Sequence, residues 1–239
     1  LTVPADALAG STASFSMTAT STSSPSETAS QTFEVVVDQH YGVSMAVIDT
    51  ESKNGAPGSS VDFAFNIVNT GNGQDTFDIN VEGASLWSPM SSTPTLTLDA
   101  VSFGQFLVSV VVPETMTANS NSGDIIVTVT SSDNENTVNS TIQVTASQVF
   151  DISIDHATGS DGIVTVIRDT SLQMKLNITN NGNGIDTLTL ELVNAPSWAT
   201  LGADSLVVGT IPVSLVITLS PDTAALSGRD YTFQVVATS

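Results

Sequence analysis

The chain contains the stretch NIVNTGNGQDTF at residues 66–77 and repeats it as NITNNGNGIDTL at residues 177–188. Equivalent positions such as Asn69 and Asn180 are 111 residues apart. In both copies a glycine-rich turn lies between two runs in which apolar and polar residues alternate. A turn of this kind is typical of a connection between antiparallel strands, and a repeat of this length is typical of sandwich domains in tandem.

Alternation with a period of two residues continues along most of the chain, whereas no amphipathic stretch at helical spacing exceeds about two turns. In the complete copy we expect strands near residues 41–48, 61–69, 75–82, 95–98, 101–112, 124–131 and 137–145. Seven strands in a little over a hundred residues is the immunoglobulin-like count. The predicted fold class is therefore all-β, with tandem immunoglobulin-like seven-stranded β-sandwich domains.

Further matches between the copies set the expected domain boundaries. Tyr41 pairs with Phe150, Trp87 with Trp198 and Pro113 with Pro221, at offsets of 109, 111 and 108 residues. The small differences place insertions in loops, where they cost little. We predict a C-terminal remnant of a preceding repeat at 1–38, a complete sandwich at 39–146, and a second sandwich at 147–239 that lacks its last strand.

The composition limits the classes of partner. Four Lys and Arg against 24 Asp and Glu give a formal net charge of −20, and there is no cysteine. Such a surface repels phosphate backbones and anionic headgroups, so we expect neither nucleic acid binding nor direct membrane insertion by this segment. No run approaches about 18 uninterrupted apolar residues, and the start of the chain has no signal-peptide pattern. We therefore expect any signal peptide or anchor to lie outside this chain.

The repeated turn carries the most specific pattern, and its first interpretation is structural. Glycine tolerates positive φ, asparagine tolerates the left-handed conformation, and an aspartate at this position can accept backbone N–H bonds. The expected turn residues are Gly71, Asn72, Gly73 and Asp75 in one copy and Gly182, Asn183, Gly184 and Asp186 in the other.

A second interpretation of the turn is a calcium site. Asp75, Asp78 and Asp186 are the candidate ligands, because carboxylates and backbone carbonyls are the hard oxygen donors that calcium prefers. Thr189 stands in the second copy where the first has Asp78, so the ligand set is not fully repeated. No other cofactor is expected.

Tryptophan occurs twice, at the same phase in both copies. Aromatic residues make up only 5% of the chain, so a tryptophan at the same position of both copies indicates a structural role. Trp87 and Trp198 are expected to be buried in the core of their sandwiches. The functional alternative is an exposed platform on which a sugar ring stacks.

These features resemble a known group of modules. The alternating apolar run, the Asn-x-Gly-Asn-Gly-x-Asp-Thr turn, the strand after it and the following tryptophan look like the CARDB-type and NPCBM-associated immunoglobulin-like repeats of archaeal or bacterial cell-surface and secreted proteins. The resemblance covers residues 39–239. It implies a seven-stranded sandwich used as a spacer, stalk or adhesion module, and it carries no shared catalytic residues. Ser85 stands where the second copy has Pro196 and where a proline is usual.

Two sequons make glycosylation candidates of Asn139 and Asn177. The alternation around Asn177 places it on the polar face of its strand, so we expect it to be accessible.

No catalytic residues are predicted, and the chain is not expected to be an enzyme. His40 and His156 do not repeat between the copies, and Glu82 and Glu191 are explained more simply as solvated side chains. Lys175 is the one lysine in an expected core strand. The alternation places its side chain on the outer face of that strand, which argues against an internal Lys–Asn crosslink.

The sequence thus predicts a non-catalytic, acidic, extracellular glycoprotein segment with a structural or adhesive role, as part of a cell-surface stalk, surface layer or filament. Its expected partners are other copies or neighbouring repeats, and surface glycans. Two alternatives stay open: a filament subunit assembled by strand donation between protomers, and an accessory carbohydrate-binding module of a secreted hydrolase.

Overall fold

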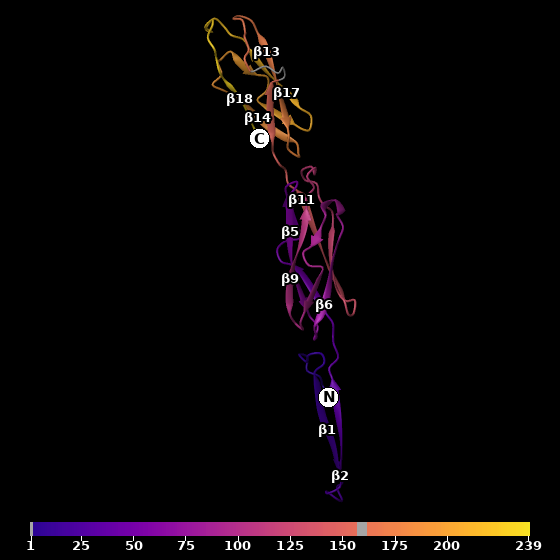
Figure 1. The fold of residues 1–239 in the computed structure, drawn as a ribbon. Helices are drawn as coiled ribbons and strands as arrows, with labels where there is room; N and C mark the ends of the chain where they lie inside the picture. The colour runs from indigo at the N-terminus through magenta and orange to yellow at the C-terminus, as the bar shows by residue number, and fades with distance from the viewer. Residues whose placement is uncertain (1, 157–161) are drawn as a thin grey trace. The chain divides into compact units, whose positions relative to one another are not determined.

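The computed structural model describes residues 2–156 and 162–239 (Figure 1). The chain divides into two compact units. Unit 1 comprises residues 1–113 and 121–145, and unit 2 comprises residues 114–120 and 146–239. Across the described ranges the elements are strands, apart from one 3-10 turn, η1 (Ser85–Trp87). None of the described residues forms a helix long and apolar enough to cross a membrane. The all-β fold predicted from the alternation is confirmed.

Unit 1 contains eleven strands. They are β1 (Thr12–Thr20), β2 (Thr28–Val36), β3 (Val43–Val47), β4 (Ser52–Gly55), β5 (Ser60–Asn69), β6 (Asp75–Glu82), β7 (Met90–Ser91), β8 (Thr95–Leu98), β9 (Phe103–Val111), β10 (Ile125–Ser131) and β11 (Thr137–Ala146). Two short strands, β4 and β7, were not predicted: the sequence of β4, Ser-Lys-Asn-Gly, has no apolar residue, and the two residues of β7 are too few to show an alternation.

Strands β3 to β11 form two sheets, with orders β4-β11-β10-β6-β8 and β3-β5-β9-β7. Successive side chains on a strand point to opposite faces, so the apolar members of each alternating run fill the space between the sheets. Phe65 is fully buried and stacks on Phe106 with ring centroids 5.1 Å apart. Burial of apolar side chains such as these stabilises the sandwich.

Strands β1 and β2 pair only with each other, in a nine-residue antiparallel register. One face is apolar, and on it Phe15 stacks on Phe33 with centroids 5.3 Å apart. The other face carries Ser and Thr, with Ser16 hydrogen-bonded to Thr32. Both faces are largely exposed, which leaves the hairpin with little hydrophobic stabilisation of its own.

The described residues of unit 2 form seven strands. They are β12 (Ile152–His156), β13 (Leu172–Asn180), β14 (Asp186–Val193), β15 (Ala199–Leu201), β16 (Ser205–Val208), β17 (Val213–Leu219) and β18 (Gln234–Thr238). They form the sheets β12-β13-β17-β15 and β16-β14-β18.

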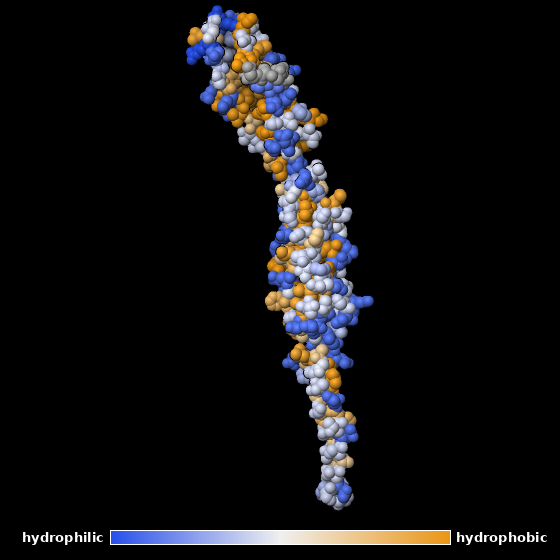
Figure 2. All heavy atoms as spheres, in the orientation of Figure 1, coloured by the Kyte–Doolittle hydropathy of each residue, from blue (hydrophilic) through white to orange (hydrophobic). Residues whose placement is uncertain are grey.

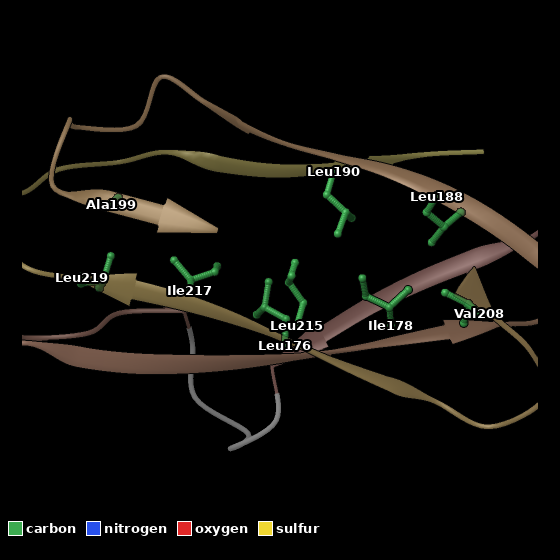
Figure 3. Close-up of a cluster of buried hydrophobic side chains, with 9 residues drawn as sticks. All are labelled: Leu176, Ile178, Leu188, Leu190, Ala199, Val208, Leu215, Ile217 and Leu219. Carbon is green, nitrogen blue, oxygen red and sulfur yellow. The ribbon is translucent and has the colours of Figure 1, made fainter. Parts of the chain in front are cut away.

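Nine buried apolar side chains make the core of unit 2, and Figure 3 shows them facing one another from strands of both sheets. They are Leu176, Ile178, Leu188, Leu190, Ala199, Val208, Leu215, Ile217 and Leu219. At the positions where unit 1 has Phe63, Phe65 and Phe77, unit 2 has Met174, Leu176 and Leu188. On the face visible in Figure 2, the exposed apolar residues of both units are scattered among hydrophilic ones rather than gathered in one patch.

The division at 38/39 and 146/147 stays a prediction. The predicted domains 1–38 and 147–239 contain residue 1 and residues 157–161, which lie outside the described part of the chain.

Replacing Phe65 with alanine should lower the free energy of unfolding of unit 1 by about 3–5 kcal/mol, because it removes a fully buried ring and leaves a cavity. The control is Phe103→Ala on the neighbouring strand, where the ring is 69% exposed, and its effect should stay within about 0.5 kcal/mol. Urea unfolding followed by tryptophan fluorescence measures both changes. Equal effects of the two variants would contradict this core.

Candidate functional site

The first asparagine of each repeated turn holds the turn together through its side chain. Asn69 is fully buried, and its Nδ2 donates to the carbonyls of Gly73 (2.8 Å) and Leu98 (3.1 Å) while its Oδ1 accepts from the N–H of Gly71 (2.8 Å). Asn180 makes the same three bonds, to Gly184, Val208 and Gly182, at 2.7, 2.9 and 2.8 Å. The side-chain amide thereby satisfies backbone groups that a strand end leaves unpaired.

The second asparagine ties the turn to earlier parts of the chain. In unit 1 the Oδ1 of Asn72 accepts from the N–H of His40 (2.6 Å), and its Nδ2 donates to the carbonyls of Ala7 and Asp38 (both 3.1 Å).

Asn183 does the same within unit 2. Its Oδ1 accepts from the N–H of Val149 (2.7 Å), and its Nδ2 donates to the carbonyls of Met116 (3.1 Å) and Ser147 (2.9 Å). The pair of asparagines therefore acts as a clasp on the segment that enters each sandwich. The sequence did not indicate this role.

The glycines of the turn are needed because another part of the backbone passes close to them, and not because they adopt positive φ. The predicted reason for them was wrong. None of Gly71, Gly73, Gly182 and Gly184 is among the residues with positive φ. A Cβ on Gly71 would instead collide with the carbonyl oxygen of His40, and a Cβ on Gly182 with that of Val149. Only glycine lets the entering segment lie this near the turn.

Gly182→Ala should destabilise unit 2 by about 1–3 kcal/mol, because the added methyl group meets backbone that must move. Gly209→Ala is the matched control: a Cβ there meets nothing within 4 Å and φ is not positive, so its effect should stay within about 0.5 kcal/mol. Denaturant unfolding curves of the two variants measure the difference. A Gly182→Ala protein as stable as the control would contradict the clasp.

The two aspartates of the turn do not accept the backbone N–H bonds that were predicted. Asp75 and Asp186 point inward and are only 2% and 5% exposed. Neither carboxylate oxygen of Asp75 has a hydrogen-bond partner in the described chain, and Asp186 has one, the hydroxyl of Ser239 at 3.0 Å from Oδ1.

The predicted calcium set is not assembled as a set. Asp78 is exposed on the opposite face of β6 from Asp75, where it accepts a hydrogen bond from Ser132 (3.1 Å). Among the described residues, no three or more His, Cys, Asp or Glu side chains gather into a metal-binding group.

The two tryptophans differ in burial. Trp87 is 3% exposed, which is incompatible with a sugar-stacking platform. Trp198 is half-buried, packs against the core of unit 2, and meets Tyr231 edge-on with centroids 5.3 Å apart. Both lie where the core interpretation places them.

The remaining residues singled out by the sequence are not gathered into a site. His40 and Glu82 are exposed in unit 1, and His156, Glu191 and Lys175 are exposed in unit 2. Asn139 is exposed on β11. Asn177 is half-buried on the central strand β13 and accepts a hydrogen bond from Ser214 (3.1 Å), so it is less accessible than predicted.

An open groove of about 610 Å³ lies in unit 1 beside β3 and β11. It is lined by Met45, Ala46, Val47, Asp49, Thr50, Glu51, Asn139 and Ser140. Strand β3 is the edge of its sheet, and β11 has a partner on its outer side only through the four-residue strand β4. Since β11 has ten residues, at least six of them lack a strand partner on that side.

The direction of the unpaired groups follows from one bond. The N–H of Gln143 points outward and donates to the carbonyl of Glu51 at 2.8 Å. Because strand geometry repeats every two residues, the N–H groups of Thr141 and Asn139 point to the same side. The groove is thus bordered by backbone donors and acceptors that are free to pair. The groove could not be predicted from the sequence, because it depends on unequal strand lengths.

The core is also incompletely covered along the groove. Val138 and Ser140 point inward but are only half-buried, whereas Ile142 and Val144 farther along β11 are fully buried. Across the groove, Met45 on β3 is half-buried too. An extended chain laid here would cover apolar side chains while pairing with the free backbone groups.

Comparison with known proteins gives no family. No family model matches the chain, and no curated protein matches it either. The resemblance to CARDB-type and NPCBM-associated repeats therefore stays a prediction.

Several solved structures show a distant likeness. One is a protein of unknown function from Porphyromonas gingivalis W83, with 14% identity, 74% of this chain and 83% of that chain covered, and a TM-score of 0.32. The E. coli chaperone DraB has 11% identity, coverage of 73% and 84%, and a TM-score of 0.32. The CsuC–CsuE chaperone–tip adhesion subunit complex of Acinetobacter baumannii has 14% identity, coverage of 81% and 97%, and a TM-score of 0.30.

These findings correct the predicted function. Apart from the Porphyromonas protein, these neighbours are named as a chaperone or as a complex of a chaperone with a tip adhesion subunit, and none is named as a stalk, a filament repeat or a carbohydrate-binding module. The prediction of a structural or adhesive segment was wrong, and so were its two alternatives, strand donation between protomers and a carbohydrate-binding module. The expected partners, which were further copies, neighbouring repeats and surface glycans, were wrong as well. At TM-scores near 0.3 the likeness assigns no activity to this chain.

Proposed function

We propose that this chain is a non-catalytic binding module that works outside the cytoplasm and holds an extended segment of a different protein. The segment would add as a strand in the groove between β3 and β11. The observation that carries the proposal is the free outer edge of β11, beside an incompletely covered core.

The backbone supplies affinity in this mode of binding. An extended peptide beside residues 137–141 would pair with the outward N–H groups of Asn139 and Thr141 and with the carbonyls of the same two residues. Such main-chain pairing accepts many sequences, and the pockets for alternate side chains decide which sequences bind.

The half-buried side chains supply selectivity. Met45 and Val47 on one border and Val138 on the other are apolar, so every second residue of the partner segment is expected to be apolar. Residues of opposite phase would face solvent and are expected to be polar.

Charge selects against acidic segments. Asp49 and Glu51 line one end of the groove, in a chain of formal net charge −20. Asp49 is paired with Lys53 at 2.6 Å, which leaves Glu51 as the acidic group without an ion pair among the described residues of the groove. A lysine or arginine near that end of the partner would be favoured, and like charges there would slow association.

The neighbour from Acinetobacter baumannii is named as a complex of a chaperone with a tip adhesion subunit. That pairing belongs to the neighbour. The proposal for this chain is supported by the groove.

The finer description of the fold is also a proposal. We propose that both units are immunoglobulin-like sandwiches with the predicted boundaries, related to the CARDB-type and NPCBM-associated modules. The matched hydrogen bonds of Asn69 with Asn180 and of Asn72 with Asn183 support it. Asn139, which is exposed at the groove, is the better of the two proposed glycosylation sites.

The binding test uses a peptide of alternating valine and threonine with one terminal lysine, measured by isothermal titration calorimetry. Asn139→Pro removes one outward N–H at an edge position, where proline is tolerated, and should weaken binding by about tenfold or more. Asn139→Ala keeps the N–H and should bind like the unchanged protein. Circular dichroism checks that both variants fold.

Two results would contradict the proposed function. One is equal affinity of the proline and alanine variants, which would show that the backbone edge is not used. The other is equal affinity for a peptide of the same composition whose valines are grouped rather than alternating.

A further inference from the structure

Each unit buries an aspartate at the same structural position, and the proposed function uses neither. Asp75 and Asp186 begin the equivalent strands β6 and β14, and both point into the core. Both oxygens of Asp75 and the Oδ2 of Asp186 lack a hydrogen-bond partner among the described residues. A repeated feature of this kind is unlike a chance packing defect, because buried polar groups are nearly always partnered.

A serine accompanies each aspartate in the same geometry. Ser131 lies opposite Phe77 on the neighbouring strand β10, diagonal to Asp75 and on the same inner face. Its hydroxyl is buried and also has no partner in the described chain. Ser239 stands in the same diagonal relation to Asp186, and there the Oγ–Oδ1 distance is 3.0 Å.

Backbone carbonyls gather at the same end of each strand. In unit 1 they belong to Gly73, two residues before Asp75, and to Leu98, the strand partner of Asp75. In unit 2 they belong to Gly184 and Val208, which hold the same places beside Asp186. The clasping asparagine uses one lone pair of each carbonyl, and a second lone pair is left.

No basic side chain neutralises either carboxylate. The chain has four Lys and Arg residues. Lys53 pairs with Asp49, Arg168 with Asp169, Arg229 lies over Tyr231, and Lys175 is exposed on β13. A buried carboxylate without a counter-charge or donors is strongly unfavourable, so a ligand that brings positive charge would stabilise the fold.

We propose that each unit binds one calcium ion at this position. The ligands are the carboxylate of Asp75 or Asp186, the hydroxyl of Ser131 or Ser239, and the adjacent backbone carbonyls. Every donor is a hard oxygen, and calcium accepts such irregular sets, whereas magnesium requires near-octahedral geometry and keeps its waters. This inference is independent of the peptide groove, and either can fail without the other.

The direct test measures calcium bound to the unchanged full chain by equilibrium dialysis with radioactive calcium. The expected result is two ions per chain, with dissociation constants on the order of 10⁻⁴–10⁻³ M, the range of extracellular calcium modules. Magnesium at the same concentration as calcium supplies the control for diffuse binding, because an acidic surface attracts divalent ions diffusely. If magnesium displaces the calcium completely at equal concentration, the binding is diffuse and the proposal is overturned.

Variants locate the ions. Asp75→Asn and Asp186→Asn should each remove one ion. Calcium should raise the melting temperature of the unchanged chain, because it binds the folded state, and the double variant should lose this rise. Asp78→Asn is the matched control: it removes the same charge from the exposed face of the same strand and should keep both ions. Ser131→Ala should weaken one site without unfolding the chain. Two ions bound to the double variant would overturn the proposal.

Discussion

The side-chain amides of the repeated turn are the interactions on which the rest of each sandwich depends. Asn69 and Asn180 close the turn by bonding to the chain on both sides of it, and Asn72 and Asn183 hold the segment that enters the sandwich. The glycines follow from this arrangement, because a Cβ at Gly71 or Gly182 would occupy the place of the entering backbone. A short motif thereby fixes where the first strand of each sandwich begins, β3 in unit 1 and β12 in unit 2.

That first strand also creates the proposed binding edge in unit 1. The chain runs as β3 along one sheet and then crosses to the other sheet as β4, which covers only part of β11. Exposed sheet edges are normally blocked, because they pair readily with other chains. Here the edge is left open next to half-buried Val138 and Met45, and the acidic residues Asp49 and Glu51 line one end of the groove. An open edge with acidic residues at one end favours a partner segment of complementary charge over nonspecific association with other chains.

Much of the fold could be predicted from the sequence, because period-two alternation is a local signal. Strands 75–82 and 95–98 were found at their predicted bounds, and the burial of Trp87 agrees with its expected core position. The role of the glycines was missed, since it depends on contacts with backbone about 30 positions away, that of His40 for Gly71 and that of Val149 for Gly182. The burial of Asp75 was missed because it depends on how the two sheets pack. The groove was missed for the same reason: it results from strands of unequal length meeting in space. The predicted function failed because a fold signature names no partner.

Amide hydrogen exchange of the free protein, resolved by NMR, tests the open edge of β11 most directly. The N–H of Gln143 donates to Glu51, whereas those of Asn139 and Thr141 face the groove without a strand partner. The account predicts slow exchange at Gln143 and fast exchange at Asn139 and Thr141, because exchange reports whether an amide is hydrogen-bonded and protected. Protection of Asn139 and Thr141 as strong as that of Gln143 would show that the edge is already occupied and would contradict the account.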